Sequence, residues 1–96
     1  MIVTNINGTS DNSCSCGSWL RHWVKFNTGR QSIPTICPAC KNNRVEVGAH
    51  VQKSESTDKS WYIVPLCKAC NGKSADTKLD IGKCSLASAN KSLTCE

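Results

Sequence analysis

Three features of the sequence predict a small α+β domain. Two Cys-x-x-Cys pairs of equal spacing occur at residues 37–40 and 67–70. Between them, apolar and polar residues alternate over residues 45–51, which is typical of a β-strand. Before them, residues 18–26 have the apolar spacing of a helix. A chain of 96 residues with few aromatic side chains is expected to form a single domain, residues 1–96, whose thin core needs cross-links.

The predicted elements before the cysteine pairs are an arm and a helix. Residues 1–13 are polar and rich in Asn, Ser and Thr, which favours a flexible arm or, at best, an edge strand. Ser18 is a suitable N-cap for the helix, and Gly29 follows its end. Its predicted buried face consists of Trp19, Leu20, Trp23 and Val24. We expect this face to supply most of the core, with His22 on the opposite side.

The cysteine segment itself predicts a knuckle, a β-hairpin and a short helix. Proline residues around the first pair favour a tight turn. In the strand over residues 45–51, the period of two places His50 on the face opposite the valines. Residues 61–66 are expected to return as a second strand, with Pro65 marking its end. A short helix is then expected to begin within residues 67–74. The second cysteine pair occupies its first turn, where backbone N–H groups stabilise thiolates.

The two cysteine pairs predict a zinc site. Its four ligands would be Cys37, Cys40, Cys67 and Cys70. Four thiolates satisfy the tetrahedral coordination of structural zinc and leave no open position, so this Zn²⁺ would be structural. Because 8 of the 96 residues are cysteine, a chain cross-linked only by disulfides is the alternative.

Knuckle, hairpin and helix follow one another as in a treble-clef zinc finger, and these residues resemble the zinc-stapled branch of the HNH (ββα-metal) endonucleases. The resemblance covers about residues 37–75, and its most specific part is Pro-Leu-Cys-x-x-Cys-Asn-x-Lys at residues 65–73. It implies a nuclease in which His50 is the general base and Asn71 binds a catalytic Mg²⁺ or Mn²⁺. From the residues alone, His50 could equally be a hydrogen-bonded strand histidine or a further zinc ligand, and Asn71 a solvent-exposed polar residue.

The chain departs from the HNH pattern at two positions. Ala49 stands where many members have an acidic metal ligand, and the central Asn expected about five residues before the second cysteine pair falls on Trp61 or Tyr62. A replacement carboxylate could come from Glu46, Glu55 or Asp58. Because the motif is degenerate, a non-catalytic zinc module that binds nucleic acid or protein is the alternative to an endonuclease.

The charge favours a polyanionic partner. The formal net charge is +5 and the pI is about 8.9. We expect DNA or RNA to contact the basic residues in or beside the cysteine segment, which are Arg44, Lys53, Lys68 and Lys73. A solvated basic surface without a ligand is the alternative. A homodimer is also consistent with the resemblance, since one HNH site cuts one strand.

The remaining cysteines are Cys14, Cys16, Cys84 and Cys95. They predict either a second zinc site or disulfides between the two ends of the chain. Short strands are expected around Leu79, Ile81 and Leu86. The chain shows neither a signal-peptide pattern nor an apolar run of about 20 residues, so we expect a cytoplasmic protein without a membrane span. If these four cysteines are disulfide-bonded, a secreted, disulfide-stapled effector or defence protein is the alternative.

Overall fold

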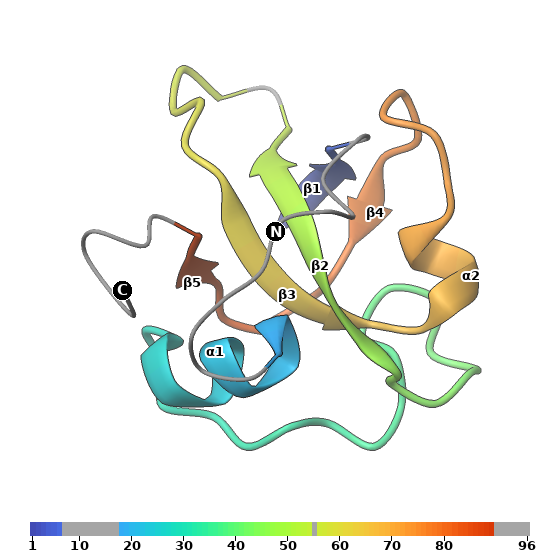
Figure 1. Cartoon of the computed structure of the whole chain (residues 1–96). Helices are drawn as coiled ribbons and strands as arrows, with labels where there is room; N and C mark the ends of the chain where they lie inside the picture. The colour runs from blue at the N-terminus through green and yellow to red at the C-terminus, as the bar shows by residue number, and fades with distance from the viewer. Residues whose placement is uncertain (7–17, 55, 90–96) are drawn as a thin grey trace.

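A five-stranded antiparallel sheet forms the centre of the computed structural model, which describes residues 1–6, 18–54 and 56–89. Its strands, in chain order, are β1 (Ile2–Asn5), β2 (Val47–Lys53), β3 (Tyr62–Leu66), β4 (Leu79–Asp80) and β5 (Ala87–Ser88). Their order across the sheet is β4-β1-β2-β3-β5 (Figure 1). The two helices are α1 (Trp19–Phe26) and the short α2 (Lys68–Asn71). The α+β class expected from the sequence is therefore confirmed.

Strands β2 and β3 form a hairpin between the two cysteine pairs. The sequence predicts that Pro65 ends the second strand, and this is wrong. Pro65 pairs with Gly48, and β3 continues to Leu66, which pairs with Val47. Strand β5 pairs only with the first two residues of β3, so at Pro65 the strand has β2 as its one described neighbour. Proline has no backbone N–H to donate, and it is tolerated at such an edge position because no second strand requires that donor.

Strand β1 lies inside the sheet, between β2 and β4. The sequence predicts a flexible arm or an edge strand over residues 1–13, whereas residues 2–5 form an inner strand of the sheet. Val3 is fully buried, and it pairs with Lys53 on one side and Leu79 on the other. The burial of this side chain outweighs the polar composition on which the expectation was based. The rest of the predicted arm, from residue 7, lies outside the described residues.

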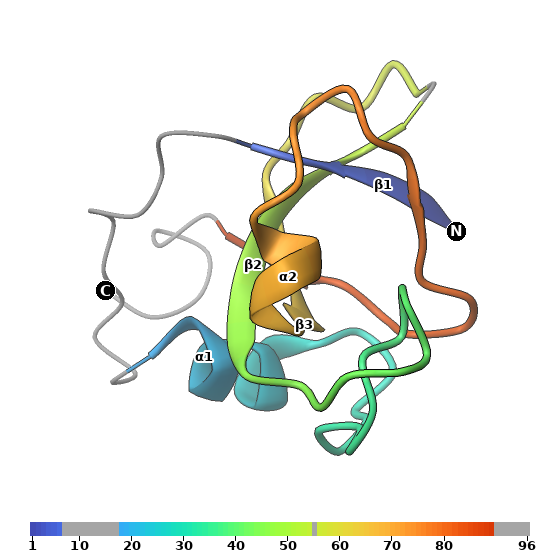
Figure 2. The same ribbon diagram turned by 90° about the vertical axis from the view of Figure 1, so that its right-hand side faces the viewer.

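Different layers cover the two faces of the sheet. The cysteine face carries α2 and a core that includes Val3, Ala49, Val51, Val64, Leu66, Cys37, Cys67 and Cys70. The helix face carries α1, whose Trp23 packs with Ile63 and Ala87. Figure 2 shows the two helices in different places beside β2. Because successive strand residues point to opposite faces, β2 contributes Ala49 and Val51 to the cysteine face and His50 to the helix face.

Helix α1 begins after Ser18, whose hydroxyl accepts a backbone N–H from the first turn, as an N-cap does. Its buried face differs from the predicted one. Val24 is 45% exposed, whereas His22, expected on the solvent side, is fully buried beside Trp23. The ring nitrogen Nε2 of His22 donates to the carbonyl oxygen of Ser88 at 2.6 Å. This bond satisfies a polar group that would otherwise oppose burial.

The contact between α1 and β2 depends on Gly48. A Cβ atom at this position would lie 2.5 Å from the carbonyl carbon of Trp19 and 2.6 Å from the backbone nitrogen of Leu20. Both are backbone atoms, which cannot move aside as a side chain can. Only glycine therefore allows the first turn of α1 to lie directly on β2.

Candidate metal centre

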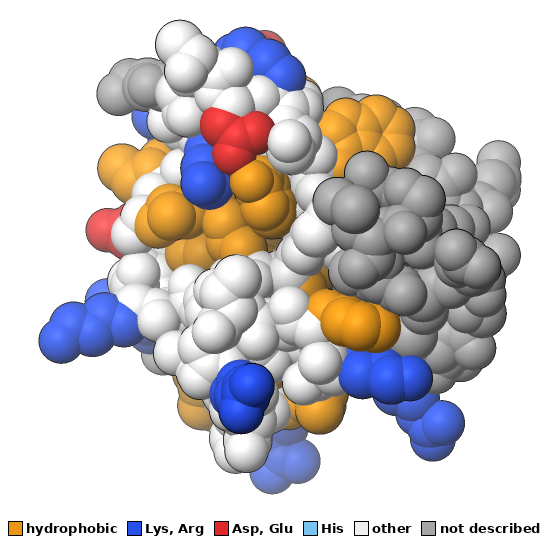
Figure 3. Space-filling model, turned by 90° about the vertical axis from the view of Figure 1, so that its left-hand side faces the viewer, with side chains coloured by type: hydrophobic (Ala, Val, Ile, Leu, Met, Phe, Trp, Pro, Cys, Tyr) orange, Lys and Arg blue, Asp and Glu red, His pale blue; other side chains and the backbone are white. Residues whose placement is uncertain are grey.

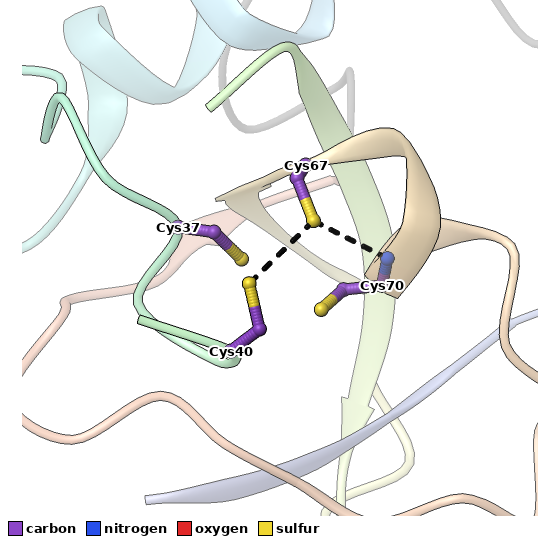
Figure 4. Close-up of side chains that lie close together, drawn as sticks. All are labelled: Cys37, Cys40, Cys67 and Cys70. Atoms are coloured by element: carbon purple, nitrogen blue, oxygen red, sulfur yellow. Dashed lines mark hydrogen bonds between the residues drawn. The ribbon is translucent and has the colours of Figure 1, made fainter. Parts of the chain in front are cut away.

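Four cysteine thiols converge on the cysteine face of the sheet. Two come from the knuckle, residues 34–44, one follows β3, and one lies in α2. The sulfur atoms of Cys37, Cys40, Cys67 and Cys70 all lie within 4.8 Å of one another. Figure 4 shows these side chains pointing toward a common centre. The structure thus brings together the four cysteines that the sequence proposes as one metal-binding set.

The sulfur–sulfur distance across the two cysteine pairs matches that of tetrahedral zinc. A tetrahedral site with Zn–S bonds of about 2.3 Å has sulfurs about 3.8 Å apart. The Sγ atoms of Cys40 and Cys67 lie 3.8 Å apart. The described cysteines form no disulfide, whose S–S bond would be only about 2.05 Å long. The cluster is therefore consistent with a structural zinc ion held by four thiolates.

Backbone and side-chain N–H groups stabilise charge on two of the sulfurs. The N–H of Asn43 donates to Cys40 Sγ at 3.4 Å, and that of Cys70 donates to Cys67 Sγ at 3.4 Å. The Asn43 carboxamide also donates to Cys67 Sγ at 3.7 Å, which links the two cysteine pairs. Donors of this kind orient metal ligands and stabilise their charged form. The sequence reasoning missed Asn43, although its place three residues after the first pair was a usable signal.

The thiols of Cys40, Cys67 and Cys70 differ in their tendency to ionise. The backbone N–H groups of Asn43 and Asn42 lower the pKa of Cys40 to about 6. Burial opposes ionisation of Cys67, but the N–H of Cys70 and the Asn43 side chain outweigh it, and the pKa of Cys67 is lowered. Burial raises the pKa of Cys70 to about 12. A bound divalent cation deprotonates its thiol ligands, so a metal ion at this cluster would ionise Cys70 despite its burial.

Helix α2, which carries half of the cluster, is bound at both ends by residues from other elements. Asn5 of β1, only 4% exposed, donates from Nδ2 to the carbonyl oxygens of Cys70 at 2.8 Å and Lys73 at 2.9 Å. At the first turn, the N–H of Lys68 donates to Glu46 Oε1 at 3.2 Å. These bonds satisfy helix-end groups that have no partner within the helix. No local sequence signal connects Asn5 with α2, because the residues are far apart in the chain.

The two residues proposed for catalysis lie on different faces of the sheet. His50 is on the helix face and is 7% exposed. Its ring contacts Trp19, with ring centroids 4.5 Å apart, and lies 6.3 Å from the ring of Trp61. Asn71 is exposed at the end of α2, and the preceding Cys70 belongs to the core of the cysteine face. The structure does not bring His50 and Asn71 together.

The basic residues proposed for nucleic acid divide into two groups. Arg44, Lys68 and Lys73 are exposed, the first on the knuckle and the others at the two ends of α2. Lys53 lies elsewhere, at the end of β2, and is half-buried. Its Nζ is 3.4 Å from a carboxylate oxygen of Asp58 and 5.1 Å from the centroid of the Tyr62 ring. Three of the four proposed residues therefore belong to the segments that carry the cysteine centre, the knuckle and the region of α2.

The second cysteine set is described only in part. Cys84 is half-buried and does not belong to the metal-binding cluster. Burial raises the pKa of its thiol to about 11, so it stays protonated at neutral pH. Cys14, Cys16 and Cys95 lie outside the described residues, as does Glu55. A second zinc site or disulfides among these cysteines remains a prediction.

Comparison of the chain with protein-family models, curated protein sequences and solved structures finds no match. Neither α1 nor α2, the helices of the described segments, has the length and apolar character needed to cross a membrane.

Proposed function

We propose that the chain is a zinc-stabilised treble-clef module that binds nucleic acid through the cations around its cysteine centre. The observation that carries the proposal is an excess of positive charge without internal partners. Among the described residues, the side chain of Lys53 and the amine of Met1 form ion pairs with carboxylates. The exposed basic side chains without such a pair are Arg21, Lys25, Arg30, Lys41, Arg44, Lys59, Lys68, Lys73 and Lys83.

Most of the described carboxylates already have partners within the fold. Asp58 accepts from the Tyr62 hydroxyl and pairs with Lys53. Asp80 lies 3.7 Å from the Met1 amine, and Glu46 accepts the N–H of α2 described above. Figure 3 views the molecule from the side opposite that of Figure 2, away from α2, and there too Lys and Arg side chains project at many places while acidic side chains are few. Phosphates are the ligands that such a surface attracts.

The treble-clef assignment is supported by the order of the elements around the cysteines. A knuckle provides the first pair, the β2–β3 hairpin follows, and α2 carries the end of the second pair. Cys67 is the N-cap of α2, and its sulfur accepts the N–H of Cys70. This arrangement supports a structural role for zinc, which would hold the knuckle and α2 together and so keep Arg44 and Lys68 on one surface.

Endonuclease activity, which the HNH resemblance implies, is the competing function. A general base must reach the attacking water. In HNH chemistry that water and the phosphate lie beside a divalent metal ion, which the last residue of the motif, here Asn71, would bind. His50 is nearly buried against α1, on the face opposite Asn71. We therefore propose that the module binds nucleic acid without cutting it.

Binding is tested with the zinc-loaded chain and fluorescein-labelled single-stranded and duplex DNA and RNA, by anisotropy at a series of salt concentrations. We expect the affinity to fall with salt. In Lys68→Gln/Lys73→Gln, the negative slope of log K against log salt should become shallower by about 2, since each phosphate contact contributes about −0.9. The matched control is Lys53→Gln, whose lysine pairs with Asp58, and its slope should be unchanged. A folded, zinc-loaded protein that shows no salt-dependent binding would exclude the proposal.

Cleavage is tested separately with supercoiled plasmid and single-stranded RNA, with and without Mg²⁺ or Mn²⁺. We expect both substrates to remain intact. Cleavage that requires the added metal and disappears in His50→Ala would establish the endonuclease, and the non-catalytic proposal would then be wrong.

A further inference from the structure

A cavity of about 560 Å³ lies between the knuckle and the connection from β4 to β5. Pro34, Ile36 and Pro38 form its knuckle side, and Ile81 lies on the other side. Its volume is within the range of about 300–1,000 Å³ that is typical of small-molecule sites. Ile36 is 43% exposed, so the cavity offers water a large apolar side chain. Such a surface gains free energy when a ligand covers it.

The charge at this cavity is positive. Lys41 and Lys83 contribute to its lining, and no described Asp or Glu does. Both lysines are exposed, and neither forms an ion pair with a described carboxylate. Asp80, the last residue of β4, lies 3.7 Å from the Met1 amine and accepts the N–H of Gly82 at 2.9 Å, and it interacts only secondarily with the charge of Lys41. The lining therefore combines an apolar surface with two cations that a ligand can neutralise.

Hydrogen bonds fix both sides of the cavity. The N–H of Lys41 donates to the carbonyl oxygen of Cys37 at 2.9 Å, and Lys41 adopts a positive φ of 58° in the knuckle turn. On the other side, Gln31 donates from Nε2 to the carbonyl oxygen of Lys83 at 3.1 Å, and its Oε1 accepts the N–H of Ser85 at 2.9 Å. A ligand would therefore meet a preformed site, which lowers the cost of ordering the protein on binding.

We propose that this cavity binds a small amphipathic carboxylate, an aliphatic or aromatic acid of modest size. Its apolar body covers the exposed side chain of Ile36 beside Pro34 and Pro38, and its carboxylate faces Lys41 and Lys83. The apolar surface supplies affinity for any hydrocarbon of suitable size, and the two lysines select an anion over a neutral or cationic analogue. Lys41 and Lys83 also belong to the unpaired cations counted above, but this proposal does not rest on nucleic-acid binding, which is tested at Lys68 and Lys73.

The test uses three probes with the same hydrocarbon chain: octanoate, octan-1-ol and octylammonium. Each is titrated into the full, zinc-loaded, ¹⁵N-labelled chain while the backbone amide shifts are followed by NMR. We expect saturable shifts at Ile36, Lys41 and Lys83. Octanoate should bind about fivefold more tightly than octan-1-ol, because each partly exposed ion pair contributes modestly, and octylammonium should bind most weakly. The absence of saturable shifts at these residues, or equal affinity for the three probes, would overturn the proposal.

Two variants show whether the cations select the ligand. In Lys41→Gln/Lys83→Gln, the affinity for octanoate should fall to that for octan-1-ol, while the affinity for octan-1-ol stays the same. Lys59→Gln, which removes an exposed lysine from the loop between β2 and β3, is the matched control and should bind octanoate as the unmodified chain does. Equal losses in the double variant and the control would mean that only the net charge of the protein matters, and the assigned site would be wrong.

Discussion

The two faces of the central sheet are stabilised in different ways. On the cysteine face, α2 has only four residues, Lys68–Asn71, and is attached through the cysteine cluster, Asn5 and Glu46. On the helix face, α1 is attached by the packing of Trp23 against Ile63 and Ala87. Isolated helices shorter than about 12–15 residues are marginal in water, so neither helix is stable without these contacts. The cysteine face thus depends on the cysteine cluster and on hydrogen bonds to α2, and the helix face depends on the packing of apolar side chains.

Metal removal should produce the largest difference between the two faces. Structural zinc contributes an apparent free energy of about 10–16 kcal/mol in small zinc fingers, which matches or exceeds the total stability of about 5–15 kcal/mol of an ordinary domain. We expect the purified chain to contain zinc in equimolar amount and to lose cooperative thermal unfolding after chelation. Metal analysis and circular dichroism measure the two quantities.

Cys84→Ser is the control for metal removal, because Cys84 lies outside the cluster. This variant should retain its zinc, whereas Cys67→Ser should lose it. An unchanged melting temperature after complete chelation would show that packing alone stabilises the cysteine face.

The helix face should respond most strongly to loss of Trp23. This side chain is fully buried, and its Nε1 donates to the carbonyl oxygen of Ser85 at 2.9 Å. Trp23→Ala should lower the free energy of unfolding by about 3–5 kcal/mol, measured by urea denaturation, without changing the affinity for zinc. Trp61→Ala, which removes a side chain that is 43% exposed, should cost much less. If both variants cost the same, the packing of α1 is not what stabilises this face.

The same contrast explains what could be predicted from the sequence. The four cysteines of the cluster lie in two short turns, and a Cys-x-x-Cys spacing fixes the direction of both sulfurs locally. The alternation of apolar residues likewise predicts the hairpin and places His50 away from the valines. Both features depend on residues that are near one another in the chain, so the structure retains them.

The features that sequence reasoning missed depend on residues far apart in the chain. The inner position of β1 requires both β2 and β4 as partners. The burial of His22 requires an acceptor on β5, the carbonyl oxygen of Ser88. A clue was present, since residues 19, 22, 23 and 26 have the spacing of one helical face, but the polar character of histidine suggested solvent. The separation of His50 from Asn71 depends on which face α2 covers, and no local motif specifies it.

Gly48→Ala tests the contact between α1 and β2 more finely. The added Cβ would lie 2.5 Å from the carbonyl carbon of Trp19, so α1 must move away from the sheet. We expect a loss of about 1–3 kcal/mol in the free energy of unfolding, with zinc retained. Gly72→Ala is the control, because its Cβ would lie 3.4 Å from the nearest atom, the carbonyl oxygen of Lys68, and should change stability by about 0.5 kcal/mol at most. Equal stability of the two variants would show that α1 adjusts at no cost.

The smallest effect is expected at the loop end of the hairpin, where Asp58 lies beside the Tyr62 hydroxyl. The Tyr62 hydroxyl, followed by the N–H of Ser60, holds the pKa of Asp58 far below its usual range. Because a carboxylate with a lowered pKa stabilises the folded state in its charged form, its contribution is complete above pH of about 4 and is lost as the pH falls further. Tyr62→Phe should return the pKa of Asp58 toward its usual value, as followed by NMR titration of the carboxylate, and should lower stability slightly at neutral pH, where the contribution of the charged form is complete. Lys53→Gln should shift this pKa less, because the lysine is the weakest of the groups that lower it. If instead Lys53→Gln has the larger effect, the ion pair rather than the tyrosine hydroxyl orders this end of the sheet, and the hairpin would depend on salt in a way that neither face does.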